Sequence, residues 1–322
     1  MHLNSKFDLF HQFKIMRIIS NLFLVCFLCS SLGFGKEYKN PLGVKVDEYL
    51  SSMVPFGFDG AVLISKHENI LINNGYGFAD PKHKMLNTSA TVFSLGSIVK
   101  PFIATLTMKL VQEGKLSLDD TFADFFIDVP EDKAGISIRQ LLSHSSGLPG
   151  AIGMDTDYIS KKDYILKVMN SELSFTPGDN YSYSNVGFTL LAMIIERITG
   201  MTYEQYLKTT ILDPAEMNNT GYSVDWKRTN LAHNISDGED NGTFLDRQYF
   251  PTWHLIGNGG LLSTTNDMFK FYLFMKNGNL LSEESKRRCG HLFLWKMLMV
   301  GSMLMEERYF GTMEGAWMVM AQ

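Results

Sequence analysis

The stretch Ser97-Ile98-Val99-Lys100 places a hydroxyl and an amine on one helix face, because side chains three positions apart are neighbours there. Pro101 is typical of a first helical turn, and Phe102, Leu106 and Leu110 follow at a period of four, which gives the helix a core face. Free N–H groups at the helix start favour a negative charge that develops beside the serine hydroxyl. A partly desolvated lysine can lose its proton and then activate the serine. The alternative is a polar serine and a solvated lysine at an ordinary helix start.

Length and charge limit the classes of protein to consider. A chain of 322 residues with 45% apolar residues can form one large or two small domains around a sizeable core. The net charge of -5 argues against a nucleic-acid partner, and the longest basic cluster, Lys286-Arg287-Arg288, is short enough to be a solvated surface.

The order of the expected elements predicts an α+β fold. Residues 44–53 are predicted to form a helix, and residues 60–65 and 70–77 are predicted to form a hairpin of two strands. Residues 97 to about 215 are predicted to be mostly helical, with loops at glycine–proline pairs. The apolar spacing over 187–198 predicts a helix that Gly200 ends.

The N-terminus has the pattern of an export signal. Lys14 and Arg17 precede an apolar run over 18–28, and Gly33-Phe34-Gly35 is a candidate cleavage site before Lys36. We expect residues 1–35 to be a signal peptide, so that the mature protein is periplasmic or extracellular. Membrane contact follows only if the segment is retained. Met16 is an alternative start to Met1.

Several stretches in a fixed order resemble the serine β-lactamase and penicillin-binding-protein superfamily, closest to its branch of class C β-lactamases, D,D-carboxypeptidases and esterases. They are Phe93 to Ala104, Gly60-Ala61-Val62-Leu63-Ile64, Gly114 to Asp120, Ile138 to Pro149, Phe175-Thr176-Pro177-Gly178, Tyr181 to Phe188, and Gly259-Gly260-Leu261-Leu262-Ser263-Thr264. The resemblance covers roughly residues 44–280. It implies an antiparallel sheet flanked by helices beside an all-helical lobe, with the active site between them.

The resemblance also implies roles for four residues. Ser97 would be acylated and its N–H would be one oxyanion donor, while Lys100 and Tyr183 would share proton transfer. Tyr183-Ser184-Asn185 matches the family's Y-x-N motif, in which Asn185 would bind a substrate amide and the lysine. A phenol near an ammonium group is expected to ionise more easily. The alternative for Tyr183 is a tyrosine buried in the helical lobe.

Other candidate chemistries have weaker support. His144 lies in a loop element of the family, and no G-x-S-x-G elbow accompanies it, so a structural role is expected. Neither H-E-x-x-H nor H-x-H occurs, so we expect no catalytic metal and no cofactor. Gly259-Gly260 is either a site of close backbone packing near the active site or an ordinary turn.

The family's third element, a K-T-G or H-x-G triad on a strand beside the cleft, is absent after Leu280. The family likeness stops near Arg288, and seven of the 19 methionines fall in residues 289–322. A divergent terminal segment and a frameshift near Arg288 are alternative explanations. We therefore expect an aberrant or divergent tail, residues 289–322, after the hydrolase domain of residues 36–288. We expect it to be poorly packed or helical, with the final strands missing or altered.

The sequence therefore predicts an exported serine hydrolase acting on amide or ester bonds of a small-molecule or peptidoglycan-derived substrate. The activity of the chain is in question because the third motif is absent. The alternative is a non-catalytic peptidoglycan-binding protein or an inactive remnant. Substrate choice among β-lactams, D-amino-acid peptides and esters, and the oligomeric state, stay open.

Overall fold

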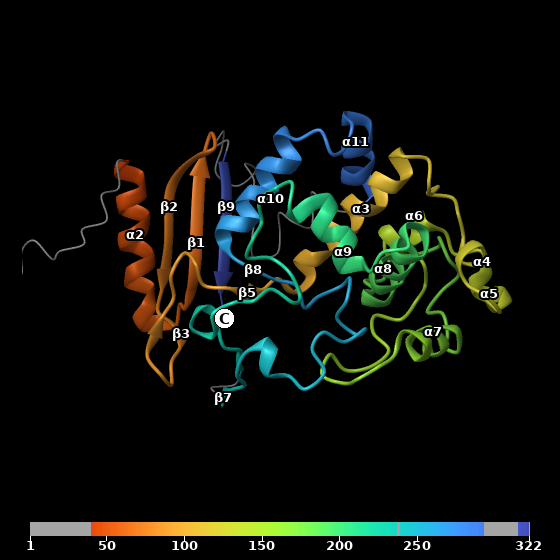
Figure 1. Cartoon of the computed structure of the whole chain (residues 1–322), viewed down its shortest axis with the longest axis horizontal. Helices are drawn as coiled ribbons and strands as arrows, with labels where there is room; N and C mark the ends of the chain where they lie inside the picture. The colour runs from red at the N-terminus through yellow and green to blue at the C-terminus, as the bar shows by residue number, and fades with distance from the viewer. Residues whose placement is uncertain (1–39, 237–238, 293–314, 322) are drawn as a thin grey trace, which may run out of the picture. The chain divides into compact units, whose positions relative to one another are not determined.

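The computed structural model of the chain describes residues 40–236, 239–292 and 315–321. These residues form an α+β fold in which helices accompany small antiparallel sheets (Figure 1). No helix in the described ranges combines the length and the apolar character needed to cross a bilayer. The expected signal peptide, residues 1–35, and the alternative start at Met16 lie outside the described residues.

The largest sheet contains three antiparallel strands in the order β2 (Asn69–Tyr76), β1 (Gly60–Lys66) and β9 (Gly315–Ala321). Apolar residues make the central strand β1 almost wholly buried. Its register places Leu63 opposite Asn73 of β2 and Met318 of β9. The predicted hairpin of residues 60–77 is confirmed.

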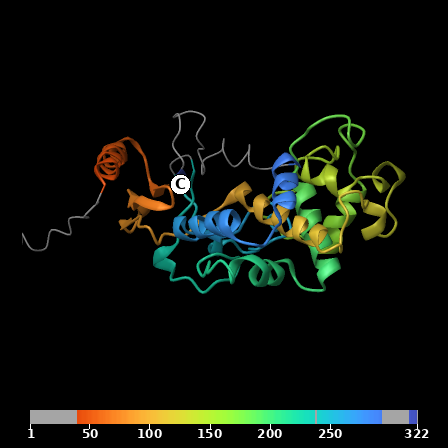
Figure 2. The same cartoon turned by 90° about the horizontal axis from the view of Figure 1, so that it is seen from above.

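Two helices accompany this sheet. Helix α2 (Pro41–Met53) is fixed to β2, because Asp47 accepts hydrogen bonds from Asn74 Nδ2 at 2.8 Å and from the hydroxyl of Tyr76 at 2.7 Å. Helix α10 (Thr265–Asn277) contacts β1 and β9, and its Asn266 accepts a hydrogen bond from Asn73 of β2 at 2.7 Å. Figure 2 shows the sheet between these two helices.

The predicted helical region is also confirmed. It contains α3 (Lys100–Gln112), α4 (Phe122–Phe125), α5 (Glu131–Ala134), α6 (Ile138–Leu142), α7 (Lys161–Met169), α8 (Asn185–Thr199) and α9 (Tyr203–Leu207). Helices α3 and α8 have most of their residues buried and pack against each other. Helix α8 ends at Gly200, whose φ of 69° lies in the left-handed region that favours glycine.

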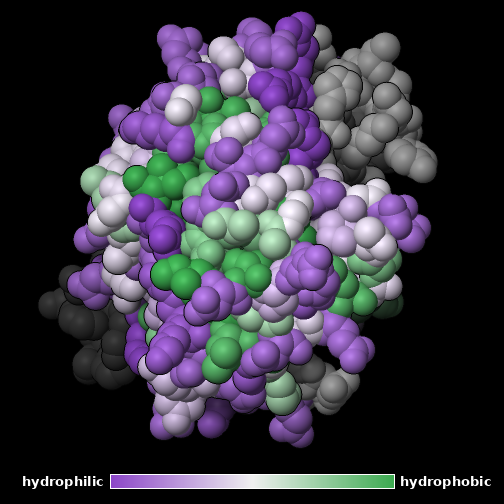
Figure 3. All heavy atoms as spheres, turned by 90° about the vertical axis from the view of Figure 1, so that its right-hand side faces the viewer, coloured by the Kyte–Doolittle hydropathy of each residue, from purple (hydrophilic) through white to green (hydrophobic). Residues whose placement is uncertain are grey.

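The face formed by the helical region carries hydrophobic groups in separate patches among hydrophilic ones (Figure 3). Single exposed apolar side chains such as Ile127 and Leu166 belong to the described surface. Scattered exposure of this kind is ordinary for a folded protein.

The remaining strands before β9 form short two-stranded sheets. They are β3 (Phe78–Asp80) with β4 (Met85–Leu86), β5 (Phe93–Ser94) with β8 (Leu262–Ser263), and β6 (Ile235–Ser236) with β7 (Glu239–Asp240). The β5–β8 pair places the chain just before Ser97 beside the chain just after Gly260. The N–H of Leu95 extends this pairing by donating to the carbonyl of Leu261 at 2.8 Å.

The tail differs from the sequence-based expectation. Helix α11 (Glu283–Leu292) runs past Arg288, but residues 315–321 form β9, which pairs with β1 along its whole length. The prediction of a poorly packed or helical tail is therefore wrong for residues 315–321. Its residues Ala316 to Ala321 carry no charge and include Trp317 and Val319, which suit a strand, and pairing with β1 satisfies backbone groups that would otherwise be unpaired. The β9 residues contain neither K-T-G nor H-x-G.

Candidate active site

Ser97 lies on a short 3-10 turn, Gly96–Val99, that connects β5 to α3. The sequence predicted a helix that begins near Ser97, whereas α3 itself begins at Lys100. The Ser97 side chain is exposed. Its Oγ lies 3.1 Å from Lys100 Nζ and 2.7 Å from the hydroxyl of Tyr183. The structure thus brings together the three residues that the sequence predicted to be catalytic.

Lys100 is buried, and burial favours the neutral form of its amine. Only 2% of the residue is exposed, and its Nζ donates a 2.9 Å hydrogen bond to the carbonyl of Asn258. Burial lowers the pKa of Lys100 to about 7, an effect that the negative charge of Asp155 partly opposes. A large fraction of Lys100 is therefore neutral at neutral pH, and its free lone pair can accept the Ser97 proton.

Tyr183 differs from the expectation that it would ionise easily. Burial raises the pKa of Tyr183, although the hydrogen bond to Ser97 acts in the opposite direction. The nearby Lys100 contributes little positive charge when it is neutral, and its Nζ lies 4.8 Å from the centre of the Tyr183 ring. Tyr183 is therefore a proton donor toward Ser97 Oγ in the resting site, and Lys100 is the better base.

Asn185 is the first residue of α8, and its backbone N–H donates to the carbonyl of Gly150 at 2.9 Å. Its side-chain Oδ1 is buried and has no hydrogen-bond partner among the described residues. The expected contact between Asn185 and Lys100 is not formed in this structure. The carbonyl of Asn258 takes that place beside the lysine.

His144 holds the segment that carries Tyr183. Its Nδ1 accepts a hydrogen bond from the N–H of Ser184 at 3.0 Å, and its carbonyl accepts one from the N–H of Ser182 at 2.9 Å. The ring lies 4.5 Å from that of Tyr183, and burial lowers the pKa of His144 to about 3. A neutral, packed imidazole agrees with the structural role expected from the sequence.

Asn258 is a site residue that the sequence analysis missed. Its Nδ2 donates to Thr189 Oγ1 at 2.7 Å and to the carbonyl of His254 at 2.8 Å, which fixes the carbonyl that binds Lys100. The only sequence signal was the following Gly259-Gly260. Gly260 has a φ of 69°, and a Cβ there would lie 3.1 Å from the Cβ of Leu255, so the pair forms both a turn and a close contact.

Replacing Tyr183 by phenylalanine tests the role of its hydroxyl. Tyr183→Phe keeps the ring beside His144 but removes the donor to Ser97 Oγ, so we expect acylation by a fluorescent penicillin to slow by about 100-fold. The matched control is Tyr181→Phe, a mostly exposed tyrosine two residues earlier, for which the rate should not change. A Tyr183→Phe rate within twofold of the original would contradict a role in proton transfer.

Comparison with known proteins identifies the family of the chain. Residues 57–290 match the model of the Beta-lactamase family. PbpX of Bacillus subtilis (strain 168) is 30% identical over 75% of this chain, and the chain spans 60% of the length of that relative.

Solved structures show the same fold. The D-amino acid amidase of Ochrobactrum anthropi SV3 is 25% identical with a TM-score of 0.66, over 76% of this chain and 74% of the amidase. The penicillin binding protein of Bacillus halodurans also has a TM-score of 0.66, over 84% of this chain and 94% of that protein, at 24% identity. With the family model matching more than half of its residues, the chain belongs to the beta-lactamase family of serine hydrolases.

Proposed function

We propose that this chain forms an acyl-enzyme on Ser97 with a substrate that carries an amide or ester bond, such as a β-lactam, a D-amino-acid amide or peptide, or a simple ester. The observation that carries the proposal is the position of Ser97 Oγ, within hydrogen-bond distance of both Lys100 Nζ and the Tyr183 hydroxyl. The similarity to a D-amino acid amidase supports the amide substrates.

The first half of the reaction uses the two proton carriers in turn. Neutral Lys100 takes the Ser97 proton while Oγ attacks the substrate carbonyl carbon, which gives a tetrahedral intermediate. Tyr183 passes its proton to the leaving nitrogen or oxygen and regains one from the Lys100 ammonium. The carbon–nitrogen or carbon–oxygen bond then breaks, and an ester on Ser97 remains.

The second half releases the acyl group. Water attacks the ester carbonyl and gives its proton to neutral Lys100, and Ser97 Oγ leaves with the proton that the Lys100 ammonium returns. The products are a carboxylic acid and the free enzyme. The Oδ1 of Asn185 is buried and unpartnered among the described residues, so the side chain would have to turn toward the substrate to accept a hydrogen bond from its N–H.

The oxyanion that forms in both halves needs hydrogen-bond donors. The Ser97 N–H is one candidate, and β9 lacks the K-T-G or H-x-G triad that the family resemblance led us to expect. Loss of one oxyanion donor typically costs 10²–10³ in kcat. We therefore expect a Ser97 adduct that forms and hydrolyses slowly.

A panel of three substrates tests the proposal: a fluorescent penicillin, D-phenylalanine amide and p-nitrophenyl butyrate. We expect a stoichiometric covalent adduct with at least one of them, and slow turnover of the amide or ester. A folded chain that forms no adduct and turns over none of the three would contradict the proposal. That result would favour the alternative of a non-catalytic binding protein or remnant.

A further inference from the structure

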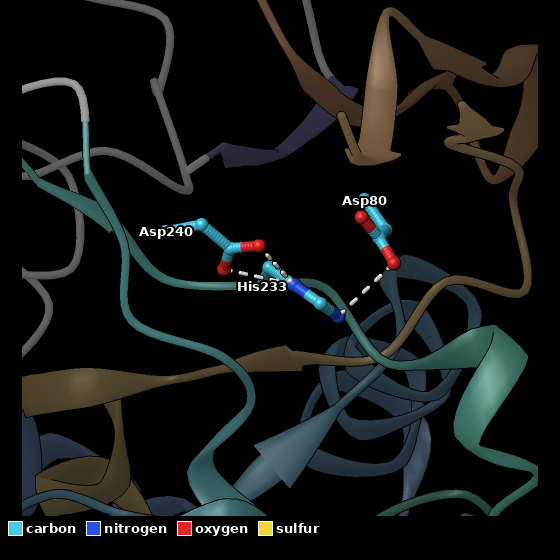
Figure 4. Close-up of side chains that lie close together, drawn as sticks. All are labelled: Asp80, His233 and Asp240. Carbon is cyan, nitrogen blue, oxygen red and sulfur yellow. Dashed lines mark hydrogen bonds and ion pairs between the residues drawn. The ribbon is translucent and has the colours of Figure 1, made fainter. Parts of the chain in front are cut away.

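A second cluster of ionisable side chains lies outside the catalytic residues. Asp80 ends β3, His233 precedes β6 and Asp240 ends β7, and the ligand-type atoms of the three side chains all lie within 4.8 Å of one another. Figure 4 shows the imidazole of His233 between the two carboxylates. The family mechanism above uses none of these residues.

The distances within this cluster suit a metal ion. His233 Nε2 lies 3.4 Å from Asp80 Oδ2. In a tetrahedral zinc site, two ligand atoms that each lie about 2.1 Å from the ion are about 3.4 Å from each other. The other ring nitrogen, Nδ1, lies 2.9 Å and 3.0 Å from the two oxygens of Asp240. A carboxylate in that position typically keeps the histidine proton on the nearer ring nitrogen. The other ring nitrogen can then bind the metal ion.

The charges of the cluster also favour a bound cation. Asp80 is 2% exposed, and its two oxygens lie within hydrogen-bond distance of the backbone N–H and the ring Nδ1 of His83. Within the described ranges, no lysine or arginine forms an ion pair with either carboxylate. Carboxylates that lack a lysine or arginine partner are places where a bound cation is favoured.

The backbone holds the cluster in place independently of any ion. The N–H of His233 donates to the carbonyl of Ala79 at 2.9 Å, which fixes His233 beside β3. Asp240 is held by the N–H of Gly242, also at 2.9 Å. A second imidazole is near, because His83 Nδ1 lies 2.6 Å from the same Asp80 oxygen, and most of the His83 side chain is exposed.

We propose that Asp80, His233 and Asp240 form a binding site for a divalent transition-metal ion of the zinc class. Asp80 Oδ2 and His233 Nε2 bind the ion, Asp240 orients the imidazole, and His83 or water completes the coordination. The mixture of imidazole and carboxylate favours zinc over magnesium or calcium, which prefer oxygen ligands. The sequence analysis expected no metal because the three residues belong to no spaced motif. Chain folding brings them together.

Calorimetric titration of the tag-free, chelator-treated chain with Zn²⁺ tests this proposal, and Mg²⁺ serves as the comparison ion. We expect one saturable Zn²⁺ site per chain and no saturable Mg²⁺ site. Asp240→Asn should weaken Zn²⁺ binding by about 10–100-fold, the usual effect of removing a carboxylate behind a metal-bound histidine. His233→Ala should abolish binding. Titration with Co²⁺ should give visible absorption bands that His233→Ala loses and that Asp240→Asn reaches only at a higher Co²⁺ concentration.

The matched control is His67→Asn, which removes an exposed histidine of the β1–β2 turn and should leave the affinity unchanged. Circular dichroism checks that each variant is folded. Asp80 is not substituted because its side chain is only 3% exposed, so that its loss would disturb the fold. The side chains of His233 and Asp240 are 16% and 27% exposed. Absence of a saturable Zn²⁺ site, or equal affinity in His233→Ala and the original chain, would overturn the proposal.

Discussion

Ser97→Ala is expected to abolish covalent labelling by a fluorescent penicillin. The substitution removes the hydroxyl that lies within hydrogen-bond distance of both Lys100 and Tyr183. Because Ser97 is exposed, the change should have little effect on the stability of the fold. Gel fluorescence and intact-protein mass spectrometry measure the label.

The matched control for this prediction is Ser94→Ala, which removes a nearby serine whose Oγ accepts a hydrogen bond from the N–H of Gly96. Labelling of Ser94→Ala should equal that of the original chain. Label that persists in Ser97→Ala would show that another residue is the nucleophile, and the assignment of the site would then be wrong.

Lys100→Met is expected to slow acylation by about 1,000-fold, within the usual contribution of a general base. Methionine has a similar length and suits the buried position, so the substitution removes the amine without opening a large cavity. Lys100→Arg should be about equally slow, because an arginine stays protonated and cannot accept the Ser97 proton. The measurement is the pseudo-first-order rate of penicillin labelling.

Lys109→Met is the matched control for the lysine substitution. Lys109 lies on the same helix, α3, but forms an ion pair with Glu113 near the surface, so its removal should leave the labelling rate unchanged. Full activity in Lys100→Arg would show that the lysine supplies only positive charge. The base would then have to be another group.

Local patterns in the sequence were sufficient to predict much of this site. Ser97 and Lys100 are three residues apart on one turn, and Tyr183 precedes a strongly periodic helix that Gly200 ends. These features depend on near neighbours in the chain, which the sequence shows directly. The hairpin of β1 and β2 and the buried face of α3 were predictable for the same reason.

Contacts between distant segments were not predictable. The Asn258 carbonyl meets Lys100 across 158 positions of sequence, and nothing in the local pattern marks it as an acceptor. The raised pKa of Tyr183 comes from burial, which only the folded chain determines. The same reason explains why the cluster of Asp80, His233 and Asp240 was missed. Strand β9 was missed because its pairing depends on the free edge of β1 more than on its own composition.

The central claim is that a neutral Lys100 activates Ser97, and the pH dependence of Ser97 acylation tests it most directly. Burial lowers the pKa of Lys100 from 10.5 to about 7, so the neutral form increases with pH and predominates above pH 7. Peptide mass spectrometry can follow the penicillin adduct on Ser97 between pH 5 and 9. The account predicts a rate that rises about tenfold per pH unit below pH 7 and levels off above it, with no such inflection in Lys100→Met. A rate that is flat across this range, or an adduct on a residue other than Ser97, would contradict it.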